Sequence, residues 1–437
     1  MPCTPRESAH DTLETRVDFR VSSKFEIIRD PIHGFIKLSD VERDLINSAP
    51  FQRLRRIKQL AMTDYVYPGA EHTRFGHSLG VMQFASDIFD TLRSKDESVL
   101  MKALDARSDD LNVYRQRLRL AALLHDVGHA PFSHASEEIL PTGITHELQT
   151  LEIIRSKYVA DIIDACSATT GVKAEQVAKF FEPRTIDRKV LFLKPIIDGE
   201  LDADKMDYLI RDSIFTGVHY GKFDHERLVA SLCVIENSEQ QGGMILGIEE
   251  GGVHALEALV LARYFMFTQV YFHRARRAYD MHLIGLLKDM GIKYPAEVEK
   301  YLEWDDRKVI DLASQHNDNR HARAIVERKH FKEALHTPDH TNGEQRRCFQ
   351  FLWKDICKTF DSNKLFHDEA KKASHKFSRI DFFVRKTDGG LSKIEEMSKT
   401  VKDLAPIEQY RIYADQSIRS EVKEFCRVFC RDNGILF

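Results

Sequence analysis

The chain has 437 residues, of which 43% are hydrophobic and 30% charged, a composition typical of a soluble globular protein. Its net charge of −4 at pH 7 gives no general attraction to nucleic acid or to an anionic membrane. The N-terminus lacks the apolar core of a signal peptide, no run of 18 apolar residues occurs, and the seven scattered cysteines favour reduced thiols in the cytoplasm.

The first half of the chain is predicted to be mainly helical. Residues 1–24 are polar and are expected to form a tail, and residues 25–38 predict two short strands around a turn at Pro31 and Gly34. From Asp40 onward, apolar residues recur every three or four positions, which indicates helices. These helices are expected over 40–48, 50–60, 76–93, 112–125, 133–139, 146–155, 158–167, 174–180 and 201–213.

The second half predicts a hairpin, long helices and then a more charged region. Residues 228–235 and 244–248 are expected to pair as a β-hairpin, and residues 252–290 to form one or two long helices. Further on, strands are expected at 379–386 and 408–413 and a final helix at 416–431, with breaks at 336–346 and 386–391. The predicted fold is mainly α, with a helical core over 25–290, small β-hairpins and a mixed α/β C-terminal region over 291–437.

Residues 121–134, AALLHDVGHAPFSH, form the densest group of candidate metal ligands. An apolar run leads directly into His125 and Asp126, and His129 and His134 follow. Adjacent side chains on a helix point about 100° apart, so both residues can bind metal only where the helix ends, and Gly128 supplies such a break. Imidazole and carboxylate ligands suit divalent ions of the Mg, Mn, Fe, Ni or Zn type. The alternative is a helix end with several solvated histidines.

Two further segments carry residues that could join this centre. The first spans 71–78 and contains His72, Arg74 and His77. The second spans 201–212, and its polar residues include Asp202, Asp204, Lys205, Asp207, Tyr208 and Asp212. Taken alone, the second segment is as well explained by a solvated helix face. Beside a His-Asp centre, it suggests a metal-binding carboxylate followed by a phosphate-binding lysine.

The order of His77, His125-Asp126 and Asp204 resembles the ligand set of the HD-domain superfamily of metal-dependent phosphohydrolases. Five segments, at 30–36, 51–60, 73–80, 125–134 and 204–208, resemble its deoxynucleoside triphosphate (dNTP) triphosphohydrolase branch, which includes the dGTPase-like enzymes. The resemblance covers roughly residues 25–285. It implies that these four residues bind one divalent metal ion.

The resemblance also implies roles in catalysis and phosphate binding. His146 matches the family's catalytic histidine and would donate a proton to the departing 5′ oxygen, with Glu147 or Glu137 orienting its ring. The residues expected to neutralise the triphosphate, or to assist catalysis beside it, are Arg74, His129, His134 and Lys205. Without the family context, His146 is better explained as a capping or core residue.

Selection of deoxyribose is implied in the same way. Gln59 matches a contact to the 3′-hydroxyl, and Leu60 matches a residue that leaves no room for a 2′-hydroxyl. Tyr208 would pack on the sugar, Asp212 would bind the 3′-hydroxyl and Tyr279 would close the 2′ side. The alternative is that Gln59 and Leu60 are ordinary residues of the helix predicted over 50–60.

One departure from the family affects the metal. Gly76 precedes His77 where relatives usually carry glutamate, so a carboxylate partner of His77 is expected to be missing. A second departure concerns regulation. Asn47 stands where the mammalian dNTPase of this branch carries an acid that reads guanine, whereas Arg55 is kept. The resemblance therefore argues against activation by GTP and leaves another nucleotide effector open.

The resulting hypothesis is a metal-dependent dNTP triphosphohydrolase that releases deoxynucleoside and triphosphate and assembles as a homo-oligomer. Two alternatives stay open: an HD-type phosphodiesterase or nucleotidase, and a non-catalytic nucleotide sensor.

Overall fold

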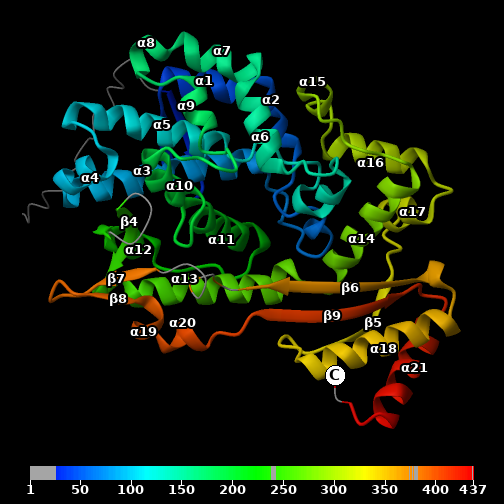
Figure 1. The fold of residues 1–437 in the computed structure, drawn as a ribbon. Helices are drawn as coiled ribbons and strands as arrows, with labels where there is room; N and C mark the ends of the chain where they lie inside the picture. The colour runs from blue at the N-terminus through cyan, green and yellow to red at the C-terminus, as the bar shows by residue number, and fades with distance from the viewer. Residues whose placement is uncertain (1–25, 238–242, 374, 376, 378–381, 436) are drawn as a thin grey trace, which may run out of the picture.

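The structure is a computed structural model that describes residues 26–237, 243–373, 375, 377, 382–435 and 437. The predicted tail over 1–24 lies outside these residues. Helices make up most of the molecule, and three small sheets complete it (Figure 1), so the mainly α prediction is confirmed. Among the described helices, none has the length and apolar character needed to cross a membrane.

The helical core starts with a two-stranded antiparallel hairpin in which Ile28 lies opposite Ile36. Two of its helices begin at side-chain caps: Glu42 accepts from the backbone N–H of Ser39 at α1 (3.0 Å), and the Asp202 side chain accepts from the backbone N–H of Lys205 at α11 (2.6 Å). The elements are β1 (Glu26–Asp30), β2 (Gly34–Leu38), α1 (Asp40–Asn47), α2 (Ala49–Arg53), α3 (Arg74–Lys95), α4 (Glu97–Leu104), α5 (Leu111–Leu124), α6 (His146–Arg155), α7 (Lys157–Ala165), α8 (Ser167–Thr170), α9 (Ala174–Ala178), α10 (Arg188–Ile197), α11 (Ala203–Thr216) and α12 (His225–Ser231).

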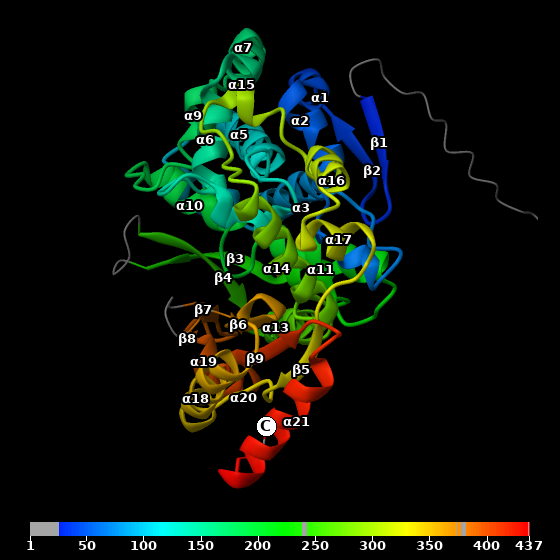
Figure 2. The ribbon, with the colours of Figure 1, turned by 90° about the vertical axis from the view of Figure 1, so that its right-hand side faces the viewer.

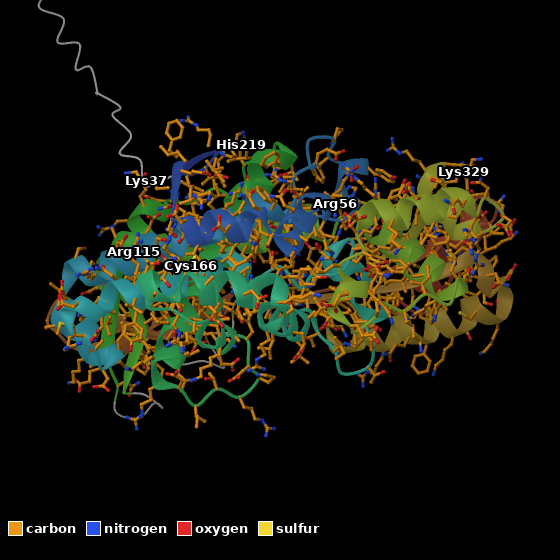
Figure 3. The ribbon with its side chains drawn as sticks, turned by 90° about the horizontal axis from the view of Figure 1, so that it is seen from above. Lys37, Arg56, Arg115, Cys166, His219 and Lys329 are labelled. Atoms are coloured by element: carbon orange, nitrogen blue, oxygen red, sulfur yellow. The ribbon has the colours of Figure 1, made fainter. Side chains whose placement is uncertain are left out.

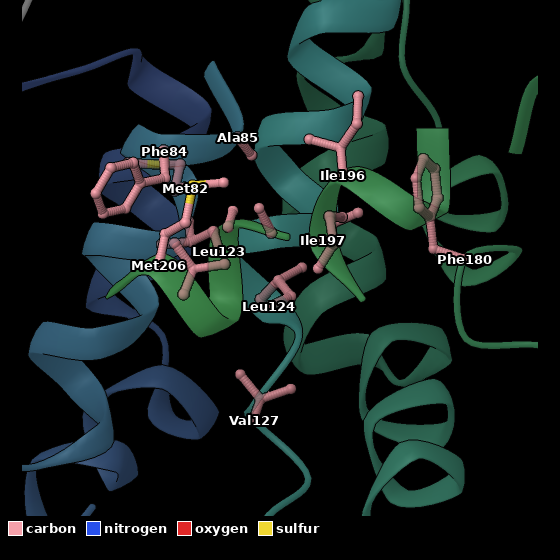
Figure 4. Packing of buried hydrophobic residues seen from close by; sticks show 14 of the residues in the cluster. Met82, Phe84, Ala85, Leu123, Leu124, Val127, Phe180, Ile196, Ile197 and Met206 are labelled. Atoms are coloured by element: carbon pink, nitrogen blue, oxygen red, sulfur yellow. The ribbon is translucent and has the colours of Figure 1, made fainter. Parts of the chain in front are cut away.

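Helix α3 lies at the centre of this core and packs against both α5 and α11. Most of its residues are buried, as expected for a helix that is surrounded by others. Figure 4 shows the contact between Met82 of α3, Leu123 of α5 and Met206 of α11, each with at most 2% of its surface exposed. This packing brings the first turns of α3 and α11 and the end of α5 to one place.

Two local predictions for the core are wrong, and further helices were not anticipated. The helix expected over 50–60 becomes α2 and a 3₁₀ turn that ends at Arg56, so Gln59 and Leu60 lie in an irregular turn. Residues 228–231 belong to α12, and the strand starts only at Leu232. Helices α4 and α10 were not anticipated, although α4 has a clear N-cap in Asp96, whose side chain accepts from the N–H of Val99.

The second half adds two sheets and further helices (Figures 1 and 2). One sheet has the order β3-β4-β7-β8, in which β4 pairs in parallel with β7, and the other has the order β5-β9-β6 with antiparallel pairs. The elements are β3 (Leu232–Glu236), β4 (Met244–Glu249), α13 (Val253–Met266), α14 (Arg274–Asp289), α15 (Val298–Tyr301), α16 (Asp306–Gln315), α17 (Arg320–Val326), β5 (Lys332–His336), α18 (Gly343–Thr359), β6 (Leu365–Lys372), β7 (Phe383–Arg385), β8 (Leu391–Lys393), α19 (Ile394–Met397), α20 (Lys399–Asp403), β9 (Ile407–Ala414) and α21 (Arg419–Asp432).

The predicted hairpin, the two helices within 252–290 and the mixed α/β end are present, with α13 and α14 separated by a π-helical turn over Phe267–Tyr271. Part of the strand expected at 379–386 lies outside the described residues. Helices α15 to α18 and strand β6 were not predicted. The proposed boundary at residue 290 stays a prediction, and the β4–β7 pair joins strands from its two sides.

Residues beyond 290 brace the segment that follows Asp126. Arg53 donates through Nη2 to the carbonyl of His129 (2.8 Å) and through Nε to the carbonyl of Trp304 (2.7 Å). Asp306 accepts from the backbone N–H of Phe132 (2.6 Å), a residue with a φ of +57°. Figure 3 shows Arg56, which pairs with Asp305, at the boundary between the first half of the chain and the helices beyond residue 290.

Candidate metal centre

The four predicted metal ligands come from three elements that meet in the core. His77 lies in the first turn of α3, and Asp204 in the first turn of α11. His125 follows the last residue of α5, and Asp126 comes next, where the helix has ended. The Nε2 atom of His77 lies 2.9 Å from Asp204 Oδ1 and 3.6 Å from Asp126 Oδ2. The Nε2 atom of His125 lies 3.2 Å from Asp126 Oδ1 and 3.8 Å from Asp204 Oδ1.

Both imidazoles are oriented to present a lone pair to this centre. His125 Nδ1 donates to the carbonyl of Ala122 (2.7 Å), and its Nε2 atom is buried without a hydrogen-bond partner. The ligand atoms of His77, His125 and Asp204 all lie within 4.8 Å of one another. Buried nitrogen and oxygen lone pairs that converge on one point are stabilised by positive charge between them, as a divalent cation supplies. The donor set therefore fits a divalent metal ion bound by nitrogen and oxygen.

Electrostatics support the same conclusion. Burial lowers the pKa of His77, but its hydrogen bonds to Asp204 and Asp207 outweigh burial and raise that pKa to about 10. Although burial raises the pKa of Asp126, the charge of Arg74 brings it well below its usual range. The surrounding carboxylates thus favour positive charge beside His77, which is supplied either by a proton on its ring or by a divalent cation that takes the place of that proton.

The carboxylate partner of His77, expected to be missing because Gly76 precedes it, is supplied by Asp207 of α11. Asp207 Oδ2 accepts from His77 Nδ1 at 2.8 Å and so fixes the ring. Asp207 itself is fully buried and is held by Arg211 through two hydrogen bonds (2.7 and 2.9 Å) and by His33 Nε2 (3.1 Å). Asp207 and Arg211 are four residues apart in the sequence, a spacing that predicts an ion pair along one face of a helix. His33 is 174 positions from Asp207, and only the tertiary fold reveals it.

Gly80 allows this arrangement because α3 passes very close to Asp207. A Cβ atom at Gly80 would lie 1.8 Å from Asp207 Oδ1 and 2.6 Å from Arg211 Nη2. We expect Gly80→Ala to displace Asp207 and to weaken metal affinity by about 10–100-fold, the usual effect of losing such a partner. Calorimetric titration with Mn²⁺ measures this. Gly343→Ala is the matched control, because a Cβ there meets nothing within 4 Å. Unchanged affinity in a folded Gly80→Ala variant would contradict the role of Asp207.

A second cluster of histidines lies beside the centre. The rings of His129 and His146 stack with their centroids 4.1 Å apart, and His129 Nε2 lies 3.2 Å from Asp126 Oδ1. Glu137 contacts His146 Nδ1 and lies 3.0 Å from His134 Nδ1. Burial lowers the pKa of His146, but the hydrogen bond and charge of Glu137 outweigh it and raise that pKa. Of the two acids expected to orient His146, Glu137 makes the close contact.

The predicted phosphate-binding residues differ in exposure and in whether their charged groups already have partners within the protein. Arg74 is buried and donates to Asp126 Oδ2 (2.5 Å) and to the hydroxyl of Ser133 (2.6 Å). His134 has 64% of its side chain exposed. Lys205 donates to the carbonyl of Gly199 (2.6 Å) and to Asp202 (2.5 Å), so its ammonium already has protein partners. Its role toward a triphosphate stays a prediction.

The predicted sugar-binding residues form two groups. Gln59 donates its backbone N–H to the carbonyl of His72 (3.1 Å), and its side-chain Oε1 is buried without a partner. Asp212 is fixed from both sides, by His72 Nε2 (2.7 Å) and by the hydroxyl of Tyr271 (2.7 Å). The ring of Tyr208 lies 6.2 Å from that of Tyr271. His72 was noted as a nearby residue without a role, and Tyr271 carried no signal in the sequence.

Leu60 and Tyr279 form the second group of predicted sugar-binding residues. Leu60 is 8% exposed and belongs to the main core cluster. Tyr279 is 1% exposed, and its ring contacts those of Tyr65 (4.8 Å) and His330 (4.3 Å). Tyr65 lies in the same irregular stretch as Gln59 and Leu60, so this stretch connects the two groups.

Two family models match long stretches of the chain. The model of the HD domain matches residues 74–212, which hold all four predicted metal ligands, and the model of the HD associated region matches residues 223–429. The chain belongs to the HD-domain superfamily. Its members are metal-dependent phosphohydrolases. The chain is 30% identical over 243 residues to the deoxynucleoside triphosphate triphosphohydrolase SAMHD1 of Danio rerio, covering 48% of this chain and 37% of that one.

Two further relatives that match over slightly longer stretches are named as uncharacterised proteins. An uncharacterised protein of Methanocaldococcus jannaschii is 38% identical over 255 residues, covering 58% of this chain and 48% of that protein. One of Bacillus subtilis is 36% identical, covering 61% of this chain and 56% of that protein. The chain thus spans about half the length of these relatives. The structure of a hypothetical protein from Aquifex aeolicus has a TM-score of 0.77 at 32% identity, covering 92% of this chain and all of that one.

Proposed function

We propose that this HD-domain protein is a dNTP triphosphohydrolase, which converts a dNTP and water to a deoxynucleoside and inorganic triphosphate. The observation that carries the proposal is the position of His146, held by Glu137 beside the candidate metal centre and stacked on His129. The similarity to SAMHD1 of Danio rerio supports it. A protonated imidazole next to a phosphate-polarising centre suits cleavage of a phosphate ester at its leaving oxygen.

The reaction assigns a task to each group of residues. A divalent ion held by His77, His125, Asp126 and Asp204 would polarise the α-phosphate. Arg74 holds the Asp126 carboxylate and places positive charge beside it. His146 gives its proton to the 5′ oxygen as the bond from that oxygen to the α-phosphorus breaks, while the oxygen of water becomes part of the triphosphate.

Product analysis tests the proposal. The full chain is incubated with each of the four dNTPs, singly and mixed, with Mg²⁺ or Mn²⁺, and the products are separated by ion-exchange chromatography. We expect inorganic triphosphate and deoxynucleoside. Release of diphosphate or monophosphate would instead indicate a nucleotidase or phosphodiesterase, and binding without turnover would indicate a nucleotide sensor.

The pH dependence of turnover should reveal the partner of His146. Because His146 acts as an acid, activity falls as pH rises through its pKa, and Glu137 places that pKa above the usual 6.5. Glu137→Gln keeps the shape but removes the charge, so we expect the alkaline limb of the kcat profile to move toward lower pH. Glu152→Gln is the control, because Glu152 lies on the same helix, α6, with an exposed side chain. An alkaline limb that stays in place in Glu137→Gln would contradict the pairing.

Selection of deoxyribose gives a further expected result. A 2′-hydroxyl would enter the apolar surface at Leu60 and lose its hydrogen bonds with water, at a cost of about 1–3 kcal/mol before any steric overlap. We expect kcat/KM to favour dNTP over the matched NTP by at least about tenfold. Leu60→Gly should narrow this preference, and Gln59→Ala should lower activity on dNTPs by removing the unpaired acceptor. Equal rates on dGTP and GTP by the unmodified protein would contradict the deoxyribose assignment.

Several finer points belong to the same proposal. A homo-oligomer, a cytoplasmic location and a nucleotide effector remain predictions, as does the identity of the metal. The homo-oligomer prediction would be contradicted if light scattering found a monomer at every concentration and that monomer were fully active.

A further inference from the structure

Asp306, the first residue of α16, holds two turns that lie next to predicted site residues. Its Oδ1 atom accepts from the backbone N–H of Phe132 at 2.6 Å, and its Oδ2 atom accepts from the backbone N–H of Lys58 at 2.8 Å. These contacts join segments 174 and 248 positions apart in the sequence. Asp306 is 6% exposed, so water competes little for its two oxygens.

The first turn belongs to the histidine cluster. Phe132 and Ser133 both have a φ of +57°, a left-handed conformation that residues other than glycine rarely adopt. Such a conformation persists where the surrounding structure holds it, as the Asp306 carboxylate does at the N–H of Phe132. The course of the chain between His129 and His134 therefore depends on a residue of α16.

The second turn carries two of the predicted sugar-binding residues, since Gln59 and Leu60 follow Lys58 directly. The hydroxyl of Ser133 donates to the carbonyl of Lys58 at 3.0 Å. Lys58 is thus tied through its N–H to Asp306 and through its carbonyl to the first turn. The turn beside the metal centre and the turn at the predicted sugar site are joined at this one residue.

Two backbone donors require two acceptor oxygens, which a carboxylate provides. An asparagine at the same place would offer one oxygen and turn an N–H group toward the other donor. Protonation of Asp306 would have a similar effect, because the O–H group that forms is a donor.

Burial raises the pKa of Asp306 to about 7, although the N–H groups of Lys58 and Phe132 and the charge of Arg53 lower it. The titratable and charged side chains around it are those of Arg53 on α2, Lys58, Tyr294 and the neighbouring Asp305. The carboxylate therefore accepts from both turns at alkaline pH and loses one acceptor below neutrality.

We propose that Asp306 is a positioning residue for sugar selection. By holding both turns, it fixes Leu60 relative to the histidine cluster and so determines how strongly a 2′-hydroxyl is rejected. The inference rests on the proposed function, in which the phosphates lie at the metal centre and the sugar lies at Leu60. The two hydrogen bonds of Asp306 go to the turns and not to the predicted metal ligands, so metal binding should not depend on it.

The ratio of kcat/KM for a dNTP to that for the matched NTP tests the proposal, because effects common to both substrates cancel in it. We expect Asp306→Asn to lower this ratio by about tenfold, a usual effect of leaving one buried donor without a partner. Asp305→Asn is the matched control: it makes the same change one residue earlier, asparagine still caps α16, and the ratio should stay as in the unmodified chain.

The pH dependence of the ratio provides a test that needs no variant. In the unmodified chain the ratio should fall as the pH is lowered from about 8 to about 6, whereas in Asp306→Asn it should stay constant. If Asp306→Asn does not fold, this measurement decides, and a constant ratio in the unmodified chain would overturn the proposal.

Hydrogen–deuterium exchange, measured by mass spectrometry, gives a readout that does not depend on turnover. Peptides that contain Lys58 and Phe132 should exchange faster in Asp306→Asn than in Asp305→Asn, with metal content unchanged in both. Unchanged exchange in these peptides, or an equal loss of activity on dNTP and NTP, would contradict the role of Asp306. Absence of turnover with every dNTP in the unmodified chain would instead contradict the proposed function.

Discussion

Asp126→Ala is expected to abolish both metal binding and turnover. The change removes one oxygen ligand from a buried centre and also leaves the Arg74 guanidinium without its carboxylate partner. Metal content after dialysis, measured by plasma mass spectrometry, should fall to background, and dNTP hydrolysis should become undetectable.

Two comparisons separate this effect from misfolding. Asp126→Asn keeps the volume and one acceptor oxygen, so the variant should fold and still lose most of its metal. Asp311 is an exposed residue of α16 outside the three segments that form the centre, so Asp311→Ala should behave as the unmodified chain. Metal retention and full turnover in a folded Asp126→Ala variant would refute the ligand assignment.

His146→Ala is expected to lower kcat by about 10²–10⁴, the range found when a general acid is lost. Metal content and KM should stay close to those of the unmodified protein, because His146 lies outside the ligand set and acts when the leaving oxygen departs. Steady-state kinetics with the preferred dNTP, at saturating metal, give both parameters.

The control for this experiment is His254→Ala. His254 pairs with Glu257 three residues away, as His134 does with Glu137, and its side chain is 94% exposed on α13. It should leave kcat unchanged. If His146→Ala raised KM and left kcat constant, His146 would serve substrate binding rather than proton transfer.

Local sequence signals account for much of the core. The helix predicted at 146–155 is present as α6 with the same bounds, since Thr145 caps it and its apolar residues follow the helical period. The end of α5 at Leu124 agrees with the break expected near His125. Helices that depend on tertiary contacts were not predicted from the sequence. Helix α10 contains Pro195, which argues against a helix in the sequence although the structure accommodates it.

In the C-terminal region, prediction from the sequence failed for a different reason. Helix α18 starts at a capping box formed by Asn342 and Gln345, inside the stretch taken as a break, so the signal was present but was outweighed by Pro338 and Gly343. Strand β6 alternates buried and exposed residues around Asp368, yet no strand was predicted from its charged sequence. Burial of Asp368 beside Arg277 is a pairing across 91 positions that no local pattern reveals.

The candidate site follows the same division. Residues whose type and spacing carry the chemistry, such as His125 next to Asp126, could be identified from the sequence. Residues that position them could not, because their contacts join distant segments. Tyr271 binds Asp212 across 59 positions, and it does so from a π-helical turn that periodicity does not predict.

Hydrolysis in ¹⁸O-labelled water tests the central claim most directly. The full chain is incubated with one dNTP and a divalent metal, and both products are analysed by mass spectrometry. The proposed reaction, in which water attacks the α-phosphorus and His146 protonates the departing 5′ oxygen, predicts the label in inorganic triphosphate and an unlabelled deoxynucleoside. Label in the deoxynucleoside, or a deoxynucleoside monophosphate as the product, would contradict the account.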